Sequence, residues 1–320
     1  MSEPFICAYT LNGDGSGTRV TKEQLAGDSR PTWIHLSARV ASARQWLAKE
    51  AALPDPMLAK ALLAEDTRPR ILPNENGVLL ILRGVNLNEN AEPDDMVSIR
   101  IWIERNRFIS VQLRDLKGVA EMQDILQSGS GPVDVNDLLT FFIEGSIKRL
   151  SPVLADLADG VDELEDQILQ MQLTGVREQI ISIRRRTSIF NRFLSPQKDI
   201  VGRLSDGSAL QLNDQLKRRL HEAHNDMTRF VEDLQAIRER AQSVQSEVTN
   251  ILTARLNRNT YAFSIIAAIF LPLSFLTGLL GINIPGIPGE EDPEAFLVFC
   301  GILAGVVLAQ VAIFKKLRWF

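Results

Sequence analysis

Two long uncharged segments near the C-terminus constrain this chain more than any other feature. The first runs from Tyr261 to Leu280 and the second from Ala295 to Phe314, each with twenty residues and no Asp, Glu, Lys, Arg or His. A helix of that length rises about 30 Å, the thickness of the hydrocarbon core of a bilayer. We therefore predict two transmembrane helices, because core helices of soluble proteins seldom stay uncharged for so long twice in succession.

Charged residues around these segments predict their orientation. The connecting loop has no Lys or Arg, and its four acidic residues are Glu290, Glu291, Asp292 and Glu294. Basic residues lie at the opposite ends of the two segments: Arg255 and Arg258 before the first, and Lys315, Lys316 and Arg318 after the second. Because cytoplasmic flanks carry the excess of Lys and Arg, both chain termini are predicted to face the cytoplasm.

Upstream of the first span, apolar residues recur in steps of four and three from Leu216 to Ile251. Five such heptads predict a coiled-coil seam. Neither Pro nor Gly occurs between Ser208 and Pro272, so one helix is expected to run from about residue 209 into the membrane.

The same spacing marks two earlier segments, 143–171 and 180–194. They predict an antiparallel helical hairpin that closes at Gly175, with the return helix ending near Pro196. Pro152 is expected either to kink the first helix or to mark its start.

The first 130 residues show a different pattern. Residues 96–104 alternate apolar and polar side chains, and residues 108–113 follow after a turn, which predicts a β-hairpin. Further strands are expected at 5–9, 33–36 and 78–85, and helices at 41–52, 56–65 and 117–127. This segment is therefore predicted to be an α/β domain.

The predicted fold is an α+β membrane protein: an N-terminal cytoplasmic α/β domain, long coiled-coil-like helices that continue into the membrane, and two C-terminal transmembrane helices. Its expected segments are the α/β domain (1–130), the cytoplasmic stalk (131–258), the first transmembrane helix (259–283), the external loop (284–294), the second transmembrane helix (295–314) and a basic cytoplasmic tail (315–320).

Composition and motifs exclude several classes of protein. The net charge of −5 argues against a nucleic-acid binder, and Cys7 and Cys300 alone make no disulfide framework. Gly13-x-Gly15-x-Gly17 lacks the Lys and Ser/Thr of a phosphate-binding loop and predicts a surface turn. No arrangement of residues resembles a nucleophile with its base, so we predict neither an enzyme nor a bound cofactor.

Histidines could indicate a metal site, but none is predicted strongly here. His221 and His224 lie three residues apart on the long helix, yet no third ligand is evident nearby, so a solvated helix flank is favoured over a zinc site. His35, alone on an apolar strand, is expected to be structural.

The first span carries a stripe of mostly small or polar residues that should avoid lipid. It consists of Thr260, Ser264, Ala267, Leu271, Ser274, Gly278 and, beyond the last apolar turn, Asn283. Such a face could pack on the second span, or it could line a water-filled path if several copies assemble around an axis. In the second span, Gly301-x-x-x-Gly305 could form a helix–helix seam or be a chance occurrence.

These features resemble the CorA family of divalent-cation transporters. The residues that carry the resemblance are FLPLSFLTG at 270–278, the triplet Gly281-Ile282-Asn283, the short acidic loop, the second span, the basic tail, and EDTRPR at 65–70. Magnesium-transporting members have Gly-Met-Asn at the triplet. Gly-Ile-Asn followed by PGIPG is similar instead to the ZntB branch, which is associated with zinc.

The resemblance implies a homopentamer in the bacterial inner membrane, with the first span of each subunit lining a pore and the second span forming an outer ring. It implies an outer selectivity ring at Gly281, Ile282 and Asn283. The implied pore-lining residues are Asn257, Thr260, Leu271, Ser274 and Gly278, and those at the cytoplasmic mouth are Lys315, Lys316 and Arg318.

The chemistry of the spans adds a constraint. Neither contains His, Asp or Glu, so a pore lined by the first span offers only amide, hydroxyl and carbonyl oxygens, whereas zinc prefers nitrogen and sulfur. We therefore expect the ion to pass largely hydrated and to be held by Asn283, with Glu290, Glu291, Asp292 and Glu294 concentrating cations outside. Selectivity among zinc, cadmium, nickel, cobalt and magnesium should then be modest.

Several alternatives remain open from sequence. Zinc is favoured as the transported ion, with a magnesium, cobalt or nickel channel of the CorA type as the alternative. Uptake and efflux are both compatible with the sequence, as are passive conduction and proton coupling, although neither span offers an ionisable relay group. A membrane-anchored coiled-coil sensor or scaffold would explain the heptads but not the polar stripe.

Overall fold

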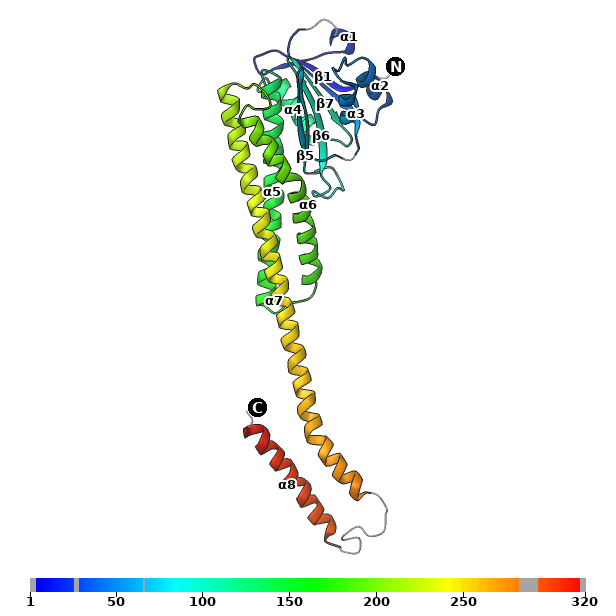
Figure 1. The fold of residues 1–320 in the computed structure, drawn as a ribbon, viewed down its shortest axis with the longest axis vertical. Helices are drawn as coiled ribbons and strands as arrows, with labels where there is room; N and C mark the ends of the chain where they lie inside the picture. The colour runs from blue at the N-terminus through cyan, green and yellow to red at the C-terminus, as the bar shows by residue number, and fades with distance from the viewer. Residues whose placement is uncertain (1–3, 26–28, 66, 282–292, 317–320) are drawn as a thin grey trace. The chain divides into compact units, whose positions relative to one another are not determined.

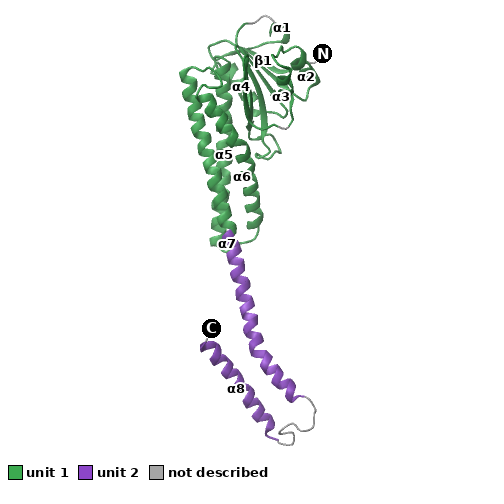
Figure 2. Ribbon diagram, viewed as in Figure 1, with its two compact units in different colours: residues 1–245 green, residues 246–320 purple. Residues whose placement is uncertain are grey.

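The computed structural model describes residues 4–25, 29–65, 67–281 and 293–316. It divides into two compact units, Met1–Gln245 and Ser246–Phe320 (Figure 2). The first unit contains a β-sheet and long helices, and the second contains the C-terminal part of one long helix and a further helix.

Seven strands form one mixed sheet in the order β2-β1-β3-β7-β6-β5-β4. Only the β3–β7 pair is parallel among these strands. The strands are β1 (Phe5–Leu11), β2 (Gly17–Arg19), β3 (Thr32–Ser37), β4 (Arg70–Asn74), β5 (Gly77–Gly84), β6 (Val97–Glu104) and β7 (Arg107–Gln112). The predicted hairpin is confirmed as β6 and β7, and the predicted strands at 5–9, 33–36 and 78–85 are confirmed as β1, β3 and β5. The short edge strands β2 and β4 were not predicted.

Eight helices are described (Figure 1). They are α1 (Lys22–Leu25), α2 (Ala41–Lys49), α3 (Pro56–Leu63), α4 (Lys117–Ser128), α5 (Val135–Leu169), α6 (Val176–Ser205), α7 (Asp214–Leu280) and α8 (Ala295–Lys316). The predicted helices at 41–52, 56–65 and 117–127 are confirmed as α2, α3 and α4. Gly13 and Gly15 both have positive φ in the turn between β1 and β2, as a surface turn requires.

Helices cover both faces of the sheet. On one face, Trp46 of α2 and Leu62 of α3 are buried in a core with Leu79 and Trp102 of the sheet. On the other face, the ring of Phe142 on α5 lies 5.9 Å from that of Phe108 and 5.6 Å from that of Trp33. The strands are consequently buried on both sides, which explains their richness in Val, Ile and Leu.

The long helices α5, α6 and α7 pack together in the first unit (Figure 1). Every seam position of α7 from Leu216 to Val244 is buried, which confirms the predicted heptads over that range. The turn between α5 and α6 ends at Gly175, whose φ of +77° favours glycine and confirms the predicted hairpin closure.

The two helices that contain prolines differ from the prediction at one end each. The return helix does not end near Pro196 but continues as α6 to Ser205, because Ile200, Val201 and Leu204 extend its buried face beyond the proline. Pro152 does not mark the start of α5, which begins at Val135, where the Asp134 carboxylate caps the helix by accepting hydrogen bonds from two backbone N–H groups. In both helices, packing outweighs the one backbone hydrogen bond that a proline removes.

Candidate functional site

The second unit contains the apolar part of α7 and the whole of α8. Among the described residues, these are the two helices long and apolar enough to cross a membrane. This finding agrees with the two predicted spans.

The described residues of the predicted polar stripe are all exposed in the single chain: Thr260, Ser264, Ala267, Leu271, Ser274 and Gly278 of α7. A different face of the same helix is partly buried, comprising Ile265, Ala268, Ile269, Leu273 and Leu276. Gln310 of α8 donates a hydrogen bond to the backbone oxygen of Ala268, which identifies that face as the one toward α8. The stripe is therefore not the surface that α8 covers. Of the two uses considered for it, this disfavours packing on the second span of the same chain and leaves the lining of a water-filled path between several copies.

Hydroxyl groups on the spanning part of α7 bond back to their own helix. Ser264 Oγ donates to the backbone oxygen of Thr260 at 2.9 Å, and Thr277 Oγ1 donates to that of Leu273 at 3.0 Å. Each hydroxyl proton is thereby occupied, so the oxygen can take part in further hydrogen bonds only as an acceptor. Such oxygens can face a cation or the water around it.

Gly281 directly follows the last residue of α7, Leu280. It is exposed, and its N–H donates to the Thr277 oxygen at 2.9 Å. A Cβ at this position would lie 2.9 Å from the same oxygen, so the close turn at the end of the helix requires glycine.

Several other predicted site residues are also described. Asn257, Glu294, Lys315 and Lys316 are exposed. The predicted site residues Ile282, Asn283, Glu290, Glu291, Asp292 and Arg318 lie outside the described residues. Across the ranges that are described, no three or more His, Cys, Asp and Glu side chains come together as a metal site. His224 instead bonds through Nδ1 to the Lys198 oxygen at 3.1 Å.

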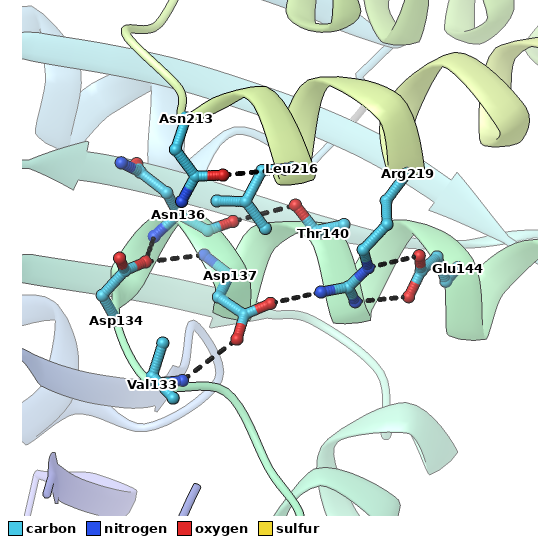
Figure 3. A network of polar contacts seen from close by, with 9 residues as sticks. All are labelled: Val133, Asp134, Asn136, Asp137, Thr140, Glu144, Asn213, Leu216 and Arg219. Carbon is cyan, nitrogen blue, oxygen red and sulfur yellow. Dashed lines mark hydrogen bonds and ion pairs between the residues drawn. The ribbon is translucent and has the colours of Figure 1, made fainter. Parts of the chain in front are cut away.

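A polar network that was not predicted joins the start of α7 to α5 (Figure 3). Arg219 of α7 contacts Glu144 through Nε and Nη2 at 2.9 and 2.7 Å, and contacts Asp137 through Nη1 at 2.6 Å. Asp137 also accepts a hydrogen bond from the backbone N–H of Val133. These carboxylates raise the pKa of the Arg219 guanidinium above its ordinary value, chiefly through its hydrogen bonds to Glu144.

A second arginine repeats this arrangement three heptads further along α7. Arg240 contacts Glu165 through Nε at 3.0 Å and through Nη2 at 2.7 Å, and it also pairs with Asp162. Because three heptads return a residue to the same face, α7 carries both arginines toward the acidic face of α5. Asp162 and Glu165 of α5 therefore both form ion pairs with α7.

Comparison with known proteins places this fold in a family. Residues 28–316 match the family described as CorA-like Mg2+ transporter protein. The divalent cation transporter CmaX of Pseudomonas aeruginosa is 37% identical, with 98% of this chain and 96% of CmaX aligned. The zinc transport protein ZntB of Pectobacterium atrosepticum is 33% identical, with 98% of this chain and 95% of ZntB aligned.

Solved structures agree with the sequence matches. The structure of full-length CmaX covers 100% of this chain and 99% of its own, with a TM-score of 0.85 and 36% identity. The CorA magnesium transporter of Methanocaldococcus jannaschii has a TM-score of 0.82 at 18% identity, with 100% of both chains covered. The latter likeness supports the fold alone.

The chain belongs to the CorA family of metal-ion transporters. This confirms the family and the fold class predicted from the sequence. The matched proteins are named as transporters and not as enzymes, in agreement with the prediction that this chain is not an enzyme.

Proposed function

We propose that this protein transports divalent metal cations, zinc among them, across the bacterial inner membrane through a homopentameric pore lined by α7. Family membership supports metal-ion transport, and the ZntB relative supports zinc. Two apolar helices in one chain are too few to enclose a pore, so a pathway along α7 needs several copies.

One observation carries the proposal: α8 covers one face of α7 and leaves the stripe from Thr260 to Gly278 exposed. The stripe consists mainly of small and polar side chains, which are unfavourable toward lipid and suited to a hydrated ion. In an assembly with α7 innermost, this stripe faces the axis, and α8 lies outside it.

We assign the two ends of the pathway from the resemblance to the CorA family and from the charges that flank the spans. Asn283 with Gly281 and Ile282 forms the outer ring, where side-chain amide and backbone oxygens hold the ion with its water. The acids of the external loop, Glu294 among them, raise the local cation concentration, and Lys315, Lys316 and Arg318 lie at the cytoplasmic mouth with both termini on that side.

Magnesium is the second candidate ion, since the family description names it. An oxygen-lined path suits hydrated magnesium at least as well as hydrated zinc. The two candidates differ in how strongly magnesium competes: zinc flux through a zinc pathway falls only in a large excess of magnesium, whereas zinc flux through a magnesium pathway falls at comparable concentrations of the two ions.

The test is flux of zinc into proteoliposomes that contain the purified full chain and a zinc-sensitive dye, with and without an imposed pH gradient. We expect flux in the wild type and its loss in Asn283→Ala. A gradient that changes the rate would establish proton coupling, whereas an unchanged rate would establish passive conduction.

The control is Ser42→Ala on α2, a residue outside the proposed pathway. Flux equal to the wild type in Asn283→Ala would contradict the ring. No flux of any divalent ion, from folded oligomeric protein, would contradict transport and favour a sensor or scaffold.

A further inference from the structure

A proline within the membrane segment of α7 leaves a backbone acceptor without its usual partner. In an α-helix, the N–H of each residue donates to the oxygen four residues earlier, and proline has no N–H. Pro272 lies inside α7, so the oxygen of Ala268 receives no such bond. Inside a bilayer, water cannot take the place of the missing donor, and another group must supply it.

The second helix supplies that donor. Gln310 of α8 places its Nε2 at 3.2 Å from the Ala268 oxygen. Gln310 is the only strongly polar residue of α8 before its basic end. The one amide side chain of this helix therefore meets the one α7 oxygen that Pro272 frees.

The contact also determines which way the amide is turned. The Ala268 oxygen can only accept a hydrogen bond, so the NH2 group of Gln310 must face it. Gln310 Oε1 is then buried and has no hydrogen-bond partner among the described residues. An unsatisfied buried oxygen is unfavourable, and the donor given to Ala268 offsets that cost.

We propose that Gln310 is a positioning residue that locks α8 to the proline break of α7 by replacing the hydrogen bond that Pro272 removes. Through this contact α8 fixes the segment of α7 that carries Ser274 and Gly278. The role in transport rests on the proposed function above, whereas the lock itself does not.

The lock is tested by a double-mutant cycle on the full chain in detergent, read as the unfolding equilibrium in a titration with a denaturing detergent. Gln310→Met keeps the size of the side chain and removes the donor. Pro272→Ala restores a backbone N–H to the Ala268 oxygen. The control is Leu308→Met, which introduces the same residue at an exposed position of α8.

We expect Gln310→Met to shift the unfolding equilibrium toward the unfolded state by about threefold to fifteenfold, the range for hydrogen bonds between membrane helices. In the Pro272→Ala background the same substitution should have almost no effect, and Leu308→Met should have little effect in either. A purely packing role for Gln310 would give equal losses in both backgrounds, and that result would overturn the lock.

Zinc flux of the same variants tests the functional part. If the lock positions the pathway, Gln310→Met lowers flux at least fivefold and Pro272→Ala/Gln310→Met matches Pro272→Ala alone. Unchanged flux in Gln310→Met would overturn the positioning role. Absence of flux in the wild type would instead contradict the proposed function, and the unfolding cycle would still decide whether the lock exists.

Discussion

The guanidinium of Arg219 on α7 and the carboxylate of Glu144 on α5 meet through two parallel hydrogen bonds of 2.9 and 2.7 Å (Figure 3). A planar fork that matches both carboxylate oxygens fixes orientation as well as distance. Because Asp137 occupies the remaining Nη1, the arginine determines how the start of α7 sits on α5. The contact lies near the N-terminal end of the helix that also carries the candidate pathway.

Replacing Arg219 should therefore weaken the helical bundle. Arg219→Ala leaves the largely buried Asp137 carboxylate without its cation, and we expect a loss of about 2 kcal/mol. Arg219→Lys keeps the charge but loses the two-point contact, so its loss should be about half as large. Thermal unfolding of the full chain measures both. Arg218→Ala, at the exposed neighbouring position, should leave the melting temperature unchanged; equal effects at 218 and 219 would contradict the role of the contact.

Gln197 provides a second test of how the helices hold the sheet. Its Oε1 accepts from the backbone N–H of Arg83 at 2.6 Å, and its Nε2 donates to the Arg83 oxygen at 3.0 Å. The side chain thus completes the backbone hydrogen bonding of β5 beyond the last paired residue of β4.

We expect Gln197→Leu to lower stability by about 2–3 kcal/mol, since it leaves a backbone donor and an acceptor unpaired. Gln179→Leu, at an exposed position of the same helix, serves as the control and should have little effect. Chemical denaturation of the full chain in detergent compares the two variants. Similar losses would mean that the effect comes from added apolar surface and not from the hydrogen bonds.

His35 predicts a dependence of stability on pH. It is fully buried, with Nδ1 at 2.7 Å from Ser110 Oγ and Nε2 at 3.0 Å from Gln112 Oε1. Because Trp33 donates to Ser110 Oγ, the Ser110 proton is free to bond Nδ1, and the imidazole carries its own proton on Nε2. Burial lowers the pKa of His35 from 6.5 to about 4.

The unfolded chain therefore binds a proton at His35 between pH 6.5 and about 4 where the folded chain does not, so stability falls as the pH falls through this window. From pH 7 to 5.5 the loss should be about 1 kcal/mol. Melting temperatures at the two pH values measure it. His35→Gln should remove this part of the slope, and His221→Gln at an exposed position should keep it. An unchanged slope in His35→Gln would exclude His35 as its source.

The sequence was sufficient for the elements whose partners are chemically distinctive. Twenty uncharged residues have few stable environments other than a bilayer, and the heptads of α7 require another helix. The strand β6 was predicted from the alternation of apolar and polar side chains along it.

Contacts to backbone atoms were not predictable, because a carbonyl is the same at every position. Arg100 stands on the polar side of the alternation in β6, yet it is fully buried and donates to the Ala64 oxygen at 2.7 Å. Gln197 and Gln310 also bond backbone atoms far along the chain. The spacing that repeats Arg219 at Arg240 was a usable signal for the ion pairs, but the choice of acidic partner depends on the register of α5 against α7.

Valine substitutions at two glycines, Gly278 on the stripe of α7 and Gly301 on α8, test whether the stripe lines the pathway. A Cβ at Gly278 would meet no atom within 4 Å, and the same holds for Gly301 on α8. Valine at either position therefore fits the single chain, and a specific effect on transport must come from the assembled pathway. We expect Gly278→Val to reduce zinc flux at least tenfold in proteoliposomes, because a branched side chain narrows the path in every subunit at once. Gly301→Val should transport normally if α8 is the outer helix, with the assembly size of both variants checked by light scattering. Loss of flux in both variants with smaller assemblies would assign both glycines to helix packing, and normal flux in Gly278→Val would remove this face from the pathway.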